Sequence, residues 1–279
     1  YNIIEQAQVA NSAYNINHLK DLIMFFVVGI IICGLYCIFL VTFSGVSIYS
    51  SISNNGLTLL GKIDKENKAK SKVKSYISKN DKVIAQMKKI MTNIQLNRKV
   101  SRPKTILVTS TNYGTGTTYV TANLAMRYSR SDKKVLIIDS DFNEGIQHKI
   151  FNINSEDGLS DLIEADTISQ EGLSKVIKQS PISNLYVLPC GEGQIDEELL
   201  ITDKIEKIIN LAKNQFDVII IDGEPILKQI TSYGWANIVN AVVIVAEFSK
   251  TKIEDIMKAK NIIEDIDGKI SGVIVNKAE

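Results

Sequence analysis

The 279-residue chain carries 32 Lys and Arg against 31 Asp and Glu, a formal net charge of +1. This length can bury one sizeable core with extensions, and the balanced charge gives no global basis for binding nucleic acid. The three cysteines are too few for a disulfide scaffold, and no pair among them has metal-ligand spacing. Because the chain begins with Tyr1 rather than Met, we expect a fragment or a processed product.

An uncharged stretch of 22 residues runs from Leu22 to Phe43. As a helix it would span roughly 33 Å, enough for a hydrocarbon core of about 30 Å. A buried core helix and a signal-peptide core are the alternatives, although a signal core is usually only about 7–15 residues long. We predict an extracytoplasmic stub (1–21) and a transmembrane helix (22–43).

Lysines flank this stretch unequally, with Lys20 alone before it and seven after it. The positive-inside rule then predicts a cell-membrane protein whose residues after about 44 are cytoplasmic. The same lysines could contact anionic headgroups or belong to a solvated linker. The seven are Lys62, Lys65, Lys68, Lys70, Lys72, Lys74 and Lys79.

The polar, lysine-rich segment 44–80 is predicted as a juxtamembrane linker, and 81–279 as the cytoplasmic domain. A helix is expected over 81–96, because apolar residues recur there at steps of three and four. Strands are then expected at 106–109, 135–138, 185–188, 218–221, 241–246 and 272–275, and helices at 118–129, 159–164, 171–178, 197–214 and 252–266. The strands are continuously apolar, which indicates an α/β fold with a mostly parallel sheet and helices on both faces.

The first strand opens into a glycine-bearing turn followed by a helix, the arrangement that binds phosphate through backbone N–H groups and a helix N-terminus. A complete phosphate loop of this class ends Gly-Lys-Ser/Thr. Here Gly116 and Thr118 are present, but Thr117 stands at the lysine position. The sequence therefore predicts a P-loop NTPase-like domain whose catalytic competence is in doubt.

Polar residues follow other strands at the carboxyl edge of the expected sheet, where ligands gather in parallel α/β folds. They are Asp139, Asp141, Asp222 and Asn276. A single aspartate after a strand is often a cap or turn residue. Together with the loop, however, these oxygens suit Mg²⁺ and a nucleotide.

Several motifs follow one another along the chain: Asp139-Ser140-Asp141, His148 to Phe151, Gly158-Leu159-Ser160, Leu188-Pro189 with Gly191, Glu198-Leu199-Leu200, 216–222 and 272–276. In this order they resemble the bacterial tyrosine kinases of capsule and exopolysaccharide export, relatives of the MinD/ParA ATPases. The segment 55–63 is similar to the end of the chain-length-determinant (polysaccharide co-polymerase) module that often precedes the kinase.

The resemblance implies roles for individual residues and the cofactors ATP or ADP with Mg²⁺. The nucleotide would contact Gly114, Thr115, Gly116, Thr117, Thr118 and Tyr119, with Asn276 near the base. The metal would be held by Thr118, Asp139 and Asp222. The catalytic pair would be Asp139 and Asp141, one of which is placed to accept the tyrosine hydroxyl proton. The resemblance further implies the membrane, polysaccharide polymerisation and export proteins, and copies of the chain itself as partners.

Departures from the family pattern cluster near the phosphates. Tyr113 replaces a proline, Asn143 and Glu144 replace basic residues, and Glu224-Pro225 replaces a proline pair. Of the residues that support ring assembly, which align with Ala85, Lys88 and Met91, one basic position remains.

The missing lysine is the change with the largest expected effect. A charge-assisted hydrogen bond is worth about 1.5–3 kcal/mol, and one donor aimed at transition-state charge about 10²–10³ in rate. A lysine from elsewhere, such as Lys104 or Lys250, could substitute.

Three functional interpretations stay open. The chain is a membrane-anchored, tyrosine-kinase-like regulator of polysaccharide biosynthesis with impaired catalysis; or a catalytically dead adaptor or oligomerisation module, that is, a pseudokinase; or a MinD/ParA-like ATPase switch.

Overall fold

The computed structural model describes residues 18–43, 46–66, 76–98, 100, 102–193 and 203–278. The chain divides into two compact units, Tyr1–Ser47 and Ile48–Glu279. We call the second the sheet unit. Most of the predicted stub, the lysines at 68, 70, 72 and 74 and the motif at 198–200 lie outside the described residues.

The first unit contains one long helix, α1 (His18–Phe43). Its large apolar side chains from Leu19 to Leu40 are between 44% and 71% exposed. They surround the helix instead of forming one stripe, as expected for a helix that lies in an apolar medium. Within the described residues, α1 is the one helix long and apolar enough to cross a membrane.

The sheet unit is built on eight strands in the order β1-β8-β7-β2-β6-β3-β5-β4. All neighbours pair in parallel except the two-residue β4, which is antiparallel to β5. The mostly parallel α/β sheet expected from the continuous apolar runs is confirmed. The strands are β1 (Leu59–Asp64), β2 (Thr105–Ser110), β3 (Val135–Asp139), β4 (Lys178–Gln179), β5 (Leu185–Leu188), β6 (Val218–Asp222), β7 (Ala241–Glu247) and β8 (Ile270–Ala278).

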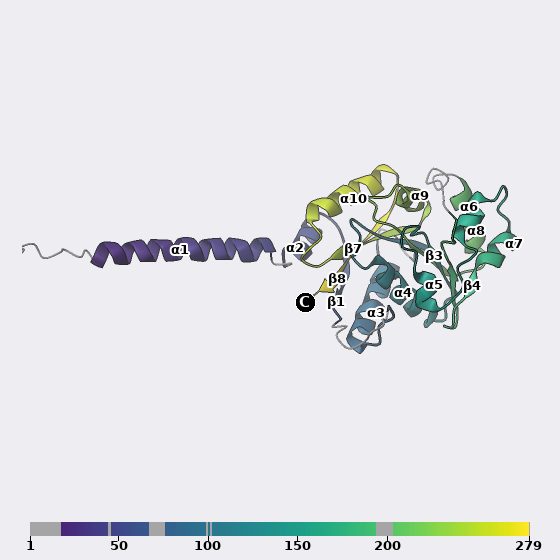
Figure 1. The fold of residues 1–279 in the computed structure, drawn as a ribbon, viewed down its shortest axis with the longest axis horizontal. Coiled ribbons are helices and arrows are strands. Elements are labelled where there is room, and N and C mark those ends of the chain that lie inside the picture. The colour runs from purple at the N-terminus through teal and green to yellow at the C-terminus, as the bar shows by residue number, and fades with distance from the viewer. Residues whose placement is uncertain are drawn as a thin grey trace, which may run out of the picture. The chain divides into compact units, whose positions relative to one another are not determined.

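Helices cover both faces of this sheet, so that α9 and α10 lie on one side and α3 and α4 on the other (Figure 1). Successive residues of a strand point to opposite faces. Thus Leu107 of β2 packs in the core with α9 and α10, while Ile106 and Val108 pack in the core with α3 and α4. The helices are α3 (Asp81–Gln95), α4 (Thr117–Ser129), α5 (Gln147–Phe151), α6 (Leu159–Glu164), α7 (Gln170–Val176), α8 (Asp203–Lys213), α9 (Thr231–Ile238) and α10 (Ile253–Asp265).

The segment predicted as a linker is partly ordered into the sheet unit, which corrects that prediction for residues 46–66. Helix α2 (Val46–Asn54) buries Ile48 and Ile52 in the core beside α10. Strand β1 extends the sheet at β8 and buries Leu60 and Ile63 against α3. The physical reason is that these apolar side chains remove more surface from water in the sheet unit than a solvated linker would allow.

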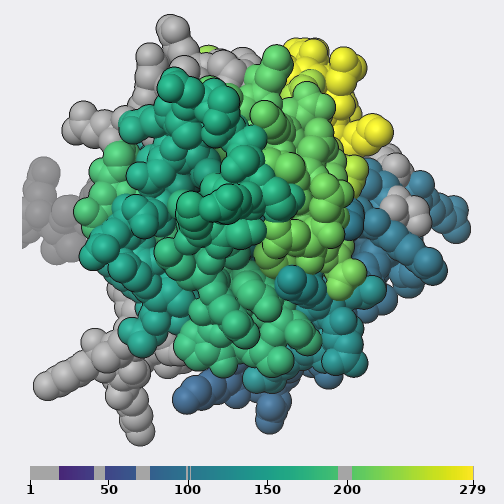
Figure 2. Space-filling view, turned by 90° about the vertical axis from the view of Figure 1, so that its right-hand side faces the viewer, coloured from purple at the N-terminus to yellow at the C-terminus, as the bar shows by residue number. Residues whose placement is uncertain are grey.

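Three further elements were not expected from the sequence: α5, α9 and β4. Each is eight residues or shorter, too short for a periodic apolar pattern to stand out. Seen from the β4 end, the surface is formed mainly by the teal and green segments that include α6, α7 and α8 (Figure 2). The remaining helices and strands lie within a few residues of their predicted positions, except that the first six residues of the helix predicted over 197–214 lie outside the described residues.

Candidate nucleotide-binding site

The turn between β2 and α4, residues 111–117, forms the phosphate loop. Gly114 and Gly116 both have left-handed backbone conformations, with φ of +75° and +93°. These are angles that glycine adopts without steric cost. A Cβ on Gly116 would come within 2.3 Å of Asn276 Nδ2, so only glycine fits beside that amide. The loop therefore has the glycine-dependent shape of a phosphate cradle.

Side chains from β8 hold this loop in place. Asn276 Nδ2 donates a hydrogen bond of 2.7 Å to the carbonyl of Thr115. Lys277 Nζ donates one of 2.7 Å to the carbonyl of Gly114. These bonds fix the orientation of two successive peptide groups of the loop, which is the kind of order that an anion nest requires.

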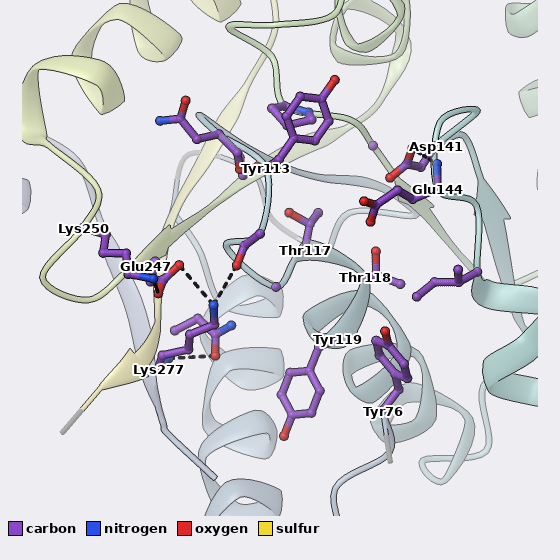
Figure 3. A pocket seen from close by; sticks show the side chains of 18 of the residues that line it. Tyr76, Tyr113, Thr117, Thr118, Tyr119, Asp141, Glu144, Glu247, Lys250 and Lys277 are labelled. Carbon is purple, nitrogen blue, oxygen red and sulfur yellow. Dashed lines mark hydrogen bonds and ion pairs between the residues drawn. The ribbon is translucent and has the colours of Figure 1, made fainter. Parts of the chain in front are cut away.

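A cavity of about 540 Å³ opens in front of the loop, and Thr117 and Thr118 point into it (Figure 3). Of the seven predicted nucleotide contacts, Gly114, Gly116, Thr117, Thr118, Tyr119 and Asn276 line this cavity. Thr115 does not: its side chain is buried, and its hydroxyl lies 3.2 Å from that of Thr117. The Tyr119 phenol extends to Glu66 and donates a 2.9 Å hydrogen bond to it.

The three predicted aspartates do not share one environment. Asp141 lines the cavity, together with Glu144 (Figure 3). Asp139 and Asp222 are 0% and 1% exposed and lie behind the cavity wall, paired on adjacent strands β3 and β6. The magnesium and nucleotide site expected at this edge of the sheet therefore has one carboxylate that lines the cavity and two that are buried.

Gln147, at the start of α5, connects the buried pair. Its N–H donates to Asp139 Oδ2 at 2.9 Å and its Nε2 to Asp222 Oδ2 at 2.8 Å. Thr121 donates to the other oxygen of Asp222 at 3.1 Å. Gln147 Oε1 is buried and has no hydrogen-bond partner in the described part of the chain.

Burial raises the pKa of both buried aspartates, and the charge of a neighbouring carboxylate adds to each shift. For Asp139 the cause is loss of hydration first, and then the charge of Asp222. Burial raises the pKa of Asp222 to about 7, and hydrogen bonds from Gln147 and the threonines oppose the shift. Two carboxylates this close favour a shared proton or a bound cation.

The residues present fit Mg²⁺ and a nucleotide. The donor set around Thr118 consists of hydroxyl and carboxylate oxygens, the hard ligands that Mg²⁺ prefers. The orphan oxygen of Gln147 adds a buried acceptor beside them. The loop supplies the glycine-only cradle for phosphate.

Two residues that could have obstructed the cavity leave it open. Glu224 is buried and turned toward Thr231 and Asn143, whose side chains donate to its carboxylate. Tyr113 stands at the rim, half-exposed, and its hydroxyl accepts a 2.9 Å hydrogen bond from Gln229.

The two lysines named as substitutes for the missing one differ in position. Lys104 immediately precedes β2, at the opposite edge of the sheet from the loop. Lys250 lines the cavity and pairs with Glu247 at 2.6 Å. A third lysine, Lys277, also lines it and pairs with Glu247 at 3.0 Å. The sequence reasoning missed Lys277 and Gln147; the position of Lys277 directly after Asn276 was the available signal.

A parallel sheet with a glycine-bearing phosphate loop after its central strand β2 defines the class of the fold: a MinD/ParA-like P-loop protein. The AAA domain model AAA_31 matches residues 103–274. The putative tyrosine-protein kinase CapB of Staphylococcus aureus is 33% identical over 189 residues, 67% of this chain and 81% of CapB. The chain therefore belongs to the bacterial tyrosine kinase (BY-kinase) family within the AAA_31 domain group.

Solved structures agree with this assignment. The chimerical protein CapA2B2 is 25% identical with a TM-score of 0.69, over 82% of this chain and 98% of that one. The kinase domain of Escherichia coli ETK has a TM-score of 0.72 at 21% identity, over 81% and 92%. The chain spans only 26% to 27% of the length of several longer tyrosine-protein kinases that it also matches.

Proposed function

We propose that this protein is a membrane-anchored, tyrosine-kinase-like P-loop protein that binds Mg-ATP or Mg-ADP and regulates capsular or exopolysaccharide production with impaired phosphoryl transfer. The observation that carries the proposal is the single cavity lined by the phosphate loop, Thr118 and Asp141, with Thr117 where a lysine is required. When bound, Mg²⁺ would neutralise phosphate charge.

The chain's own groups divide the work around that cavity. Loop N–H groups and the start of α4 bind phosphate. The Thr118 hydroxyl, with Asp139 and Asp222 behind it, would hold the metal. Asp141, the open carboxylate, is positioned to accept a proton from a tyrosine hydroxyl that enters the cavity. Thr117 supplies at most a neutral hydrogen bond to the transition-state charge. We therefore expect the rate of phosphoryl transfer to be roughly 10²–10³-fold lower than with a lysine at this position.

Anchoring and partners follow from α1 and from the relatives. The exposed apolar helix α1 is proposed as the membrane anchor, with the sheet unit on the cytoplasmic side. One relative is a putative tyrosine-protein kinase in the cps region of Klebsiella pneumoniae. We propose copies of this chain and polysaccharide polymerisation or export proteins as its partners.

A second candidate is a catalytically dead adaptor with the same fold. The observation that favours it is the Gln147 amide, whose Nε2 already occupies the Asp222 oxygen that a metal would use. The MinD/ParA-like switch is less favoured because of the apolar helix α1 and the match to tyrosine kinases.

Binding and transfer are measured separately on the full chain in detergent micelles. Melting is followed with and without Mg-ATP, and phosphate transfer from ATP to an added tyrosine peptide is followed alongside, for the natural chain, Thr117→Lys and Asp141→Asn. A nucleotide-dependent rise in melting temperature in the natural chain supports the nucleotide site. Transfer that is weak in the natural chain, strong in Thr117→Lys and lost in Asp141→Asn supports impaired catalysis.

Other outcomes overturn parts of the proposal. No stabilisation of either the natural chain or Thr117→Lys removes the nucleotide site altogether. Transfer by the natural chain at the rate of Thr117→Lys refutes impairment. Stabilisation without transfer in either protein favours the adaptor.

A further inference from the structure

Two lysines share one glutamate beside the phosphate loop. Glu247, at the end of β7, pairs through Oε1 with Lys250 at 2.6 Å and through Oε2 with Lys277 at 3.0 Å. We call these three residues the Lys–Glu cluster. All three line the same cavity as Thr117 and Thr118 (Figure 3). Their formal charges leave the cluster with one positive charge in excess.

The excess positive charge of the Lys–Glu cluster lies toward the phosphate loop. The Glu247 side chain is 10% exposed and that of Lys250 is 74% exposed, so Lys250 is largely solvated. Lys277 is the inner lysine, with its ammonium 2.7 Å from the Gly114 carbonyl. Although burial raises the pKa of Glu247, hydrogen bonds from Lys250 and Lys277 outweigh it and lower that pKa. Glu247 is therefore held in its ionised form, and one lysine is enough to balance its negative charge.

Acidic groups elsewhere in the cavity do not take up this surplus. Asp64 pairs with Lys82, outside the cavity. Glu66 accepts hydrogen bonds from Tyr119 and Ser78, at 2.9 and 2.6 Å. Asp141 and Glu144 lie across the cavity from the Lys–Glu cluster (Figure 3). Lys250 and Lys277 thus lie on the Gly114 side of the cavity, and Asp141 and Glu144 lie on the opposite side.

The backbone at Lys277 is also unusual. Its φ is +56°, in the left-handed region that non-glycine residues rarely adopt. Its N–H donates to Asn276 Oδ1 at 2.9 Å, and Asn276 in turn holds the loop at Thr115. Strain of this kind persists where surrounding contacts over-determine it, often at functional sites. Here the backbone conformation directs the Lys277 ammonium toward the phosphate loop, which has no lysine of its own.

We propose that Lys277 is the phosphate-site cation of this protein, serving in place of the lysine absent at Thr117. On nucleotide binding its ammonium exchanges Glu247 for a phosphate oxygen, while Lys250 keeps Glu247 neutralised. The inference rests on the proposed nucleotide site and adds the residue that gives it phosphate affinity.

The test measures dissociation constants of Mg-ADP and of adenosine for the full chain in detergent micelles. Lys277→Met should weaken Mg-ADP binding about ten- to a hundred-fold, the range for one charge-assisted hydrogen bond, and leave adenosine unchanged. Lys277→Arg should retain most of the affinity. Glu247→Gln should tighten Mg-ADP binding, because it removes the carboxylate that competes for Lys277. Lys258→Met, on the exposed side of α10, is the control and should change nothing.

A double-mutant cycle then measures the coupling between Lys277 and residue 117, where the lysine is absent. Thr117→Lys should raise Mg-ADP affinity much more in the Lys277→Met background than in the natural chain, because each lysine makes the other redundant. This coupling also guards against misfolding, since a damaged fold would not be restored by Thr117→Lys.

Each remaining result counts against the inference. Unchanged Mg-ADP affinity in Lys277→Met overturns it while leaving the proposed function intact. Equal losses of Mg-ADP and adenosine, or additive effects in the cycle, show a structural role instead. A natural chain that does not bind Mg-ADP overturns the proposed function and this inference together.

Discussion

Gly116→Ala should destabilise the sheet unit far more than Gly114→Ala, although both glycines have left-handed φ. For Gly114 nothing lies within 4 Å of an added Cβ. Its substitution should cost only the conformational term, about 1–2 kcal/mol. For Gly116 the same term applies, and the Cβ would also lie 2.3 Å from Asn276 Nδ2.

The extra cost of Gly116→Ala comes from displacing that amide. Asn276 must give up its 2.7 Å bond to Thr115, which is buried. Leaving a buried donor or acceptor unsatisfied costs about 1–3 kcal/mol. The total for Gly116→Ala is then about 2–5 kcal/mol, against about 1–2 for Gly114→Ala.

The assay is urea unfolding followed by the fluorescence of Trp235. This is the single tryptophan of the chain, and it is fully buried in the sheet unit. In an Asn276→Ala background the amide is gone, so the cost of Gly116→Ala should fall to that of Gly114→Ala. An equal cost in both backgrounds would refute the reasoning that Asn276 is what makes Gly116 necessary.

Three further predictions concern the core and the buried acids. Ile52→Ala should lower the free energy of unfolding by about 2–5 kcal/mol if α2 is part of the sheet unit, whereas the exposed Ser53→Ala should be close to neutral; equal effects would return α2 to a linker. The pKa of Asp222 is higher in the folded than in the unfolded chain, so ionisation of Asp222 lowers the free energy of unfolding as pH rises from about 4 to 7. Asp222→Asn should therefore raise the urea midpoint at about pH 8 and lose that advantage near pH 4. A lower midpoint for Asp222→Asn at about pH 8 would contradict this sign. Gln147→Ala removes the Nε2 donor from Asp222 and should cost about 1.5–3 kcal/mol in urea unfolding at about pH 8; no loss there would mean that the bond is not formed in solution.

The strands of the sheet unit were predictable because parallel strands buried on both faces read as unbroken apolar runs. Val218–Asp222 is an example. The exception is β1, whose sequence alternates apolar residues with Gly61, Lys62 and Asp64. It lies at the sheet edge and pairs only with β8. An edge strand with only two fully buried residues, next to a lysine-rich segment, has the composition of a linker.

At the candidate site, the sequence located the loop and the strand ends but not their depth. Asp139 and Asp222 end their strands as expected, yet α5 covers them, and α5 is a five-residue helix with no pattern to reveal it. The position of Lys277 directly after Asn276 was a signal in the sequence, but that position alone does not give the residue a role. Its importance depends on a left-handed φ and on the approach of β8 to the phosphate loop, which are properties of the folded chain.

The position of Lys277 indicates which property, nucleotide affinity or transfer rate, is affected by the threonine at residue 117. Lys277 approaches the loop from the Gly114 carbonyl side, whereas a lysine at residue 117 would extend from the first turn of α4 into the cavity. A cation on the Gly114 side of the cavity favours bound phosphate in any state, and uniform binding of that kind raises affinity without accelerating transfer. A cation that follows the transferred phosphoryl group lowers the barrier itself. The natural chain is therefore better suited to holding a nucleotide than to using it, and Thr117→Lys should raise the transfer rate by a larger factor than it raises affinity.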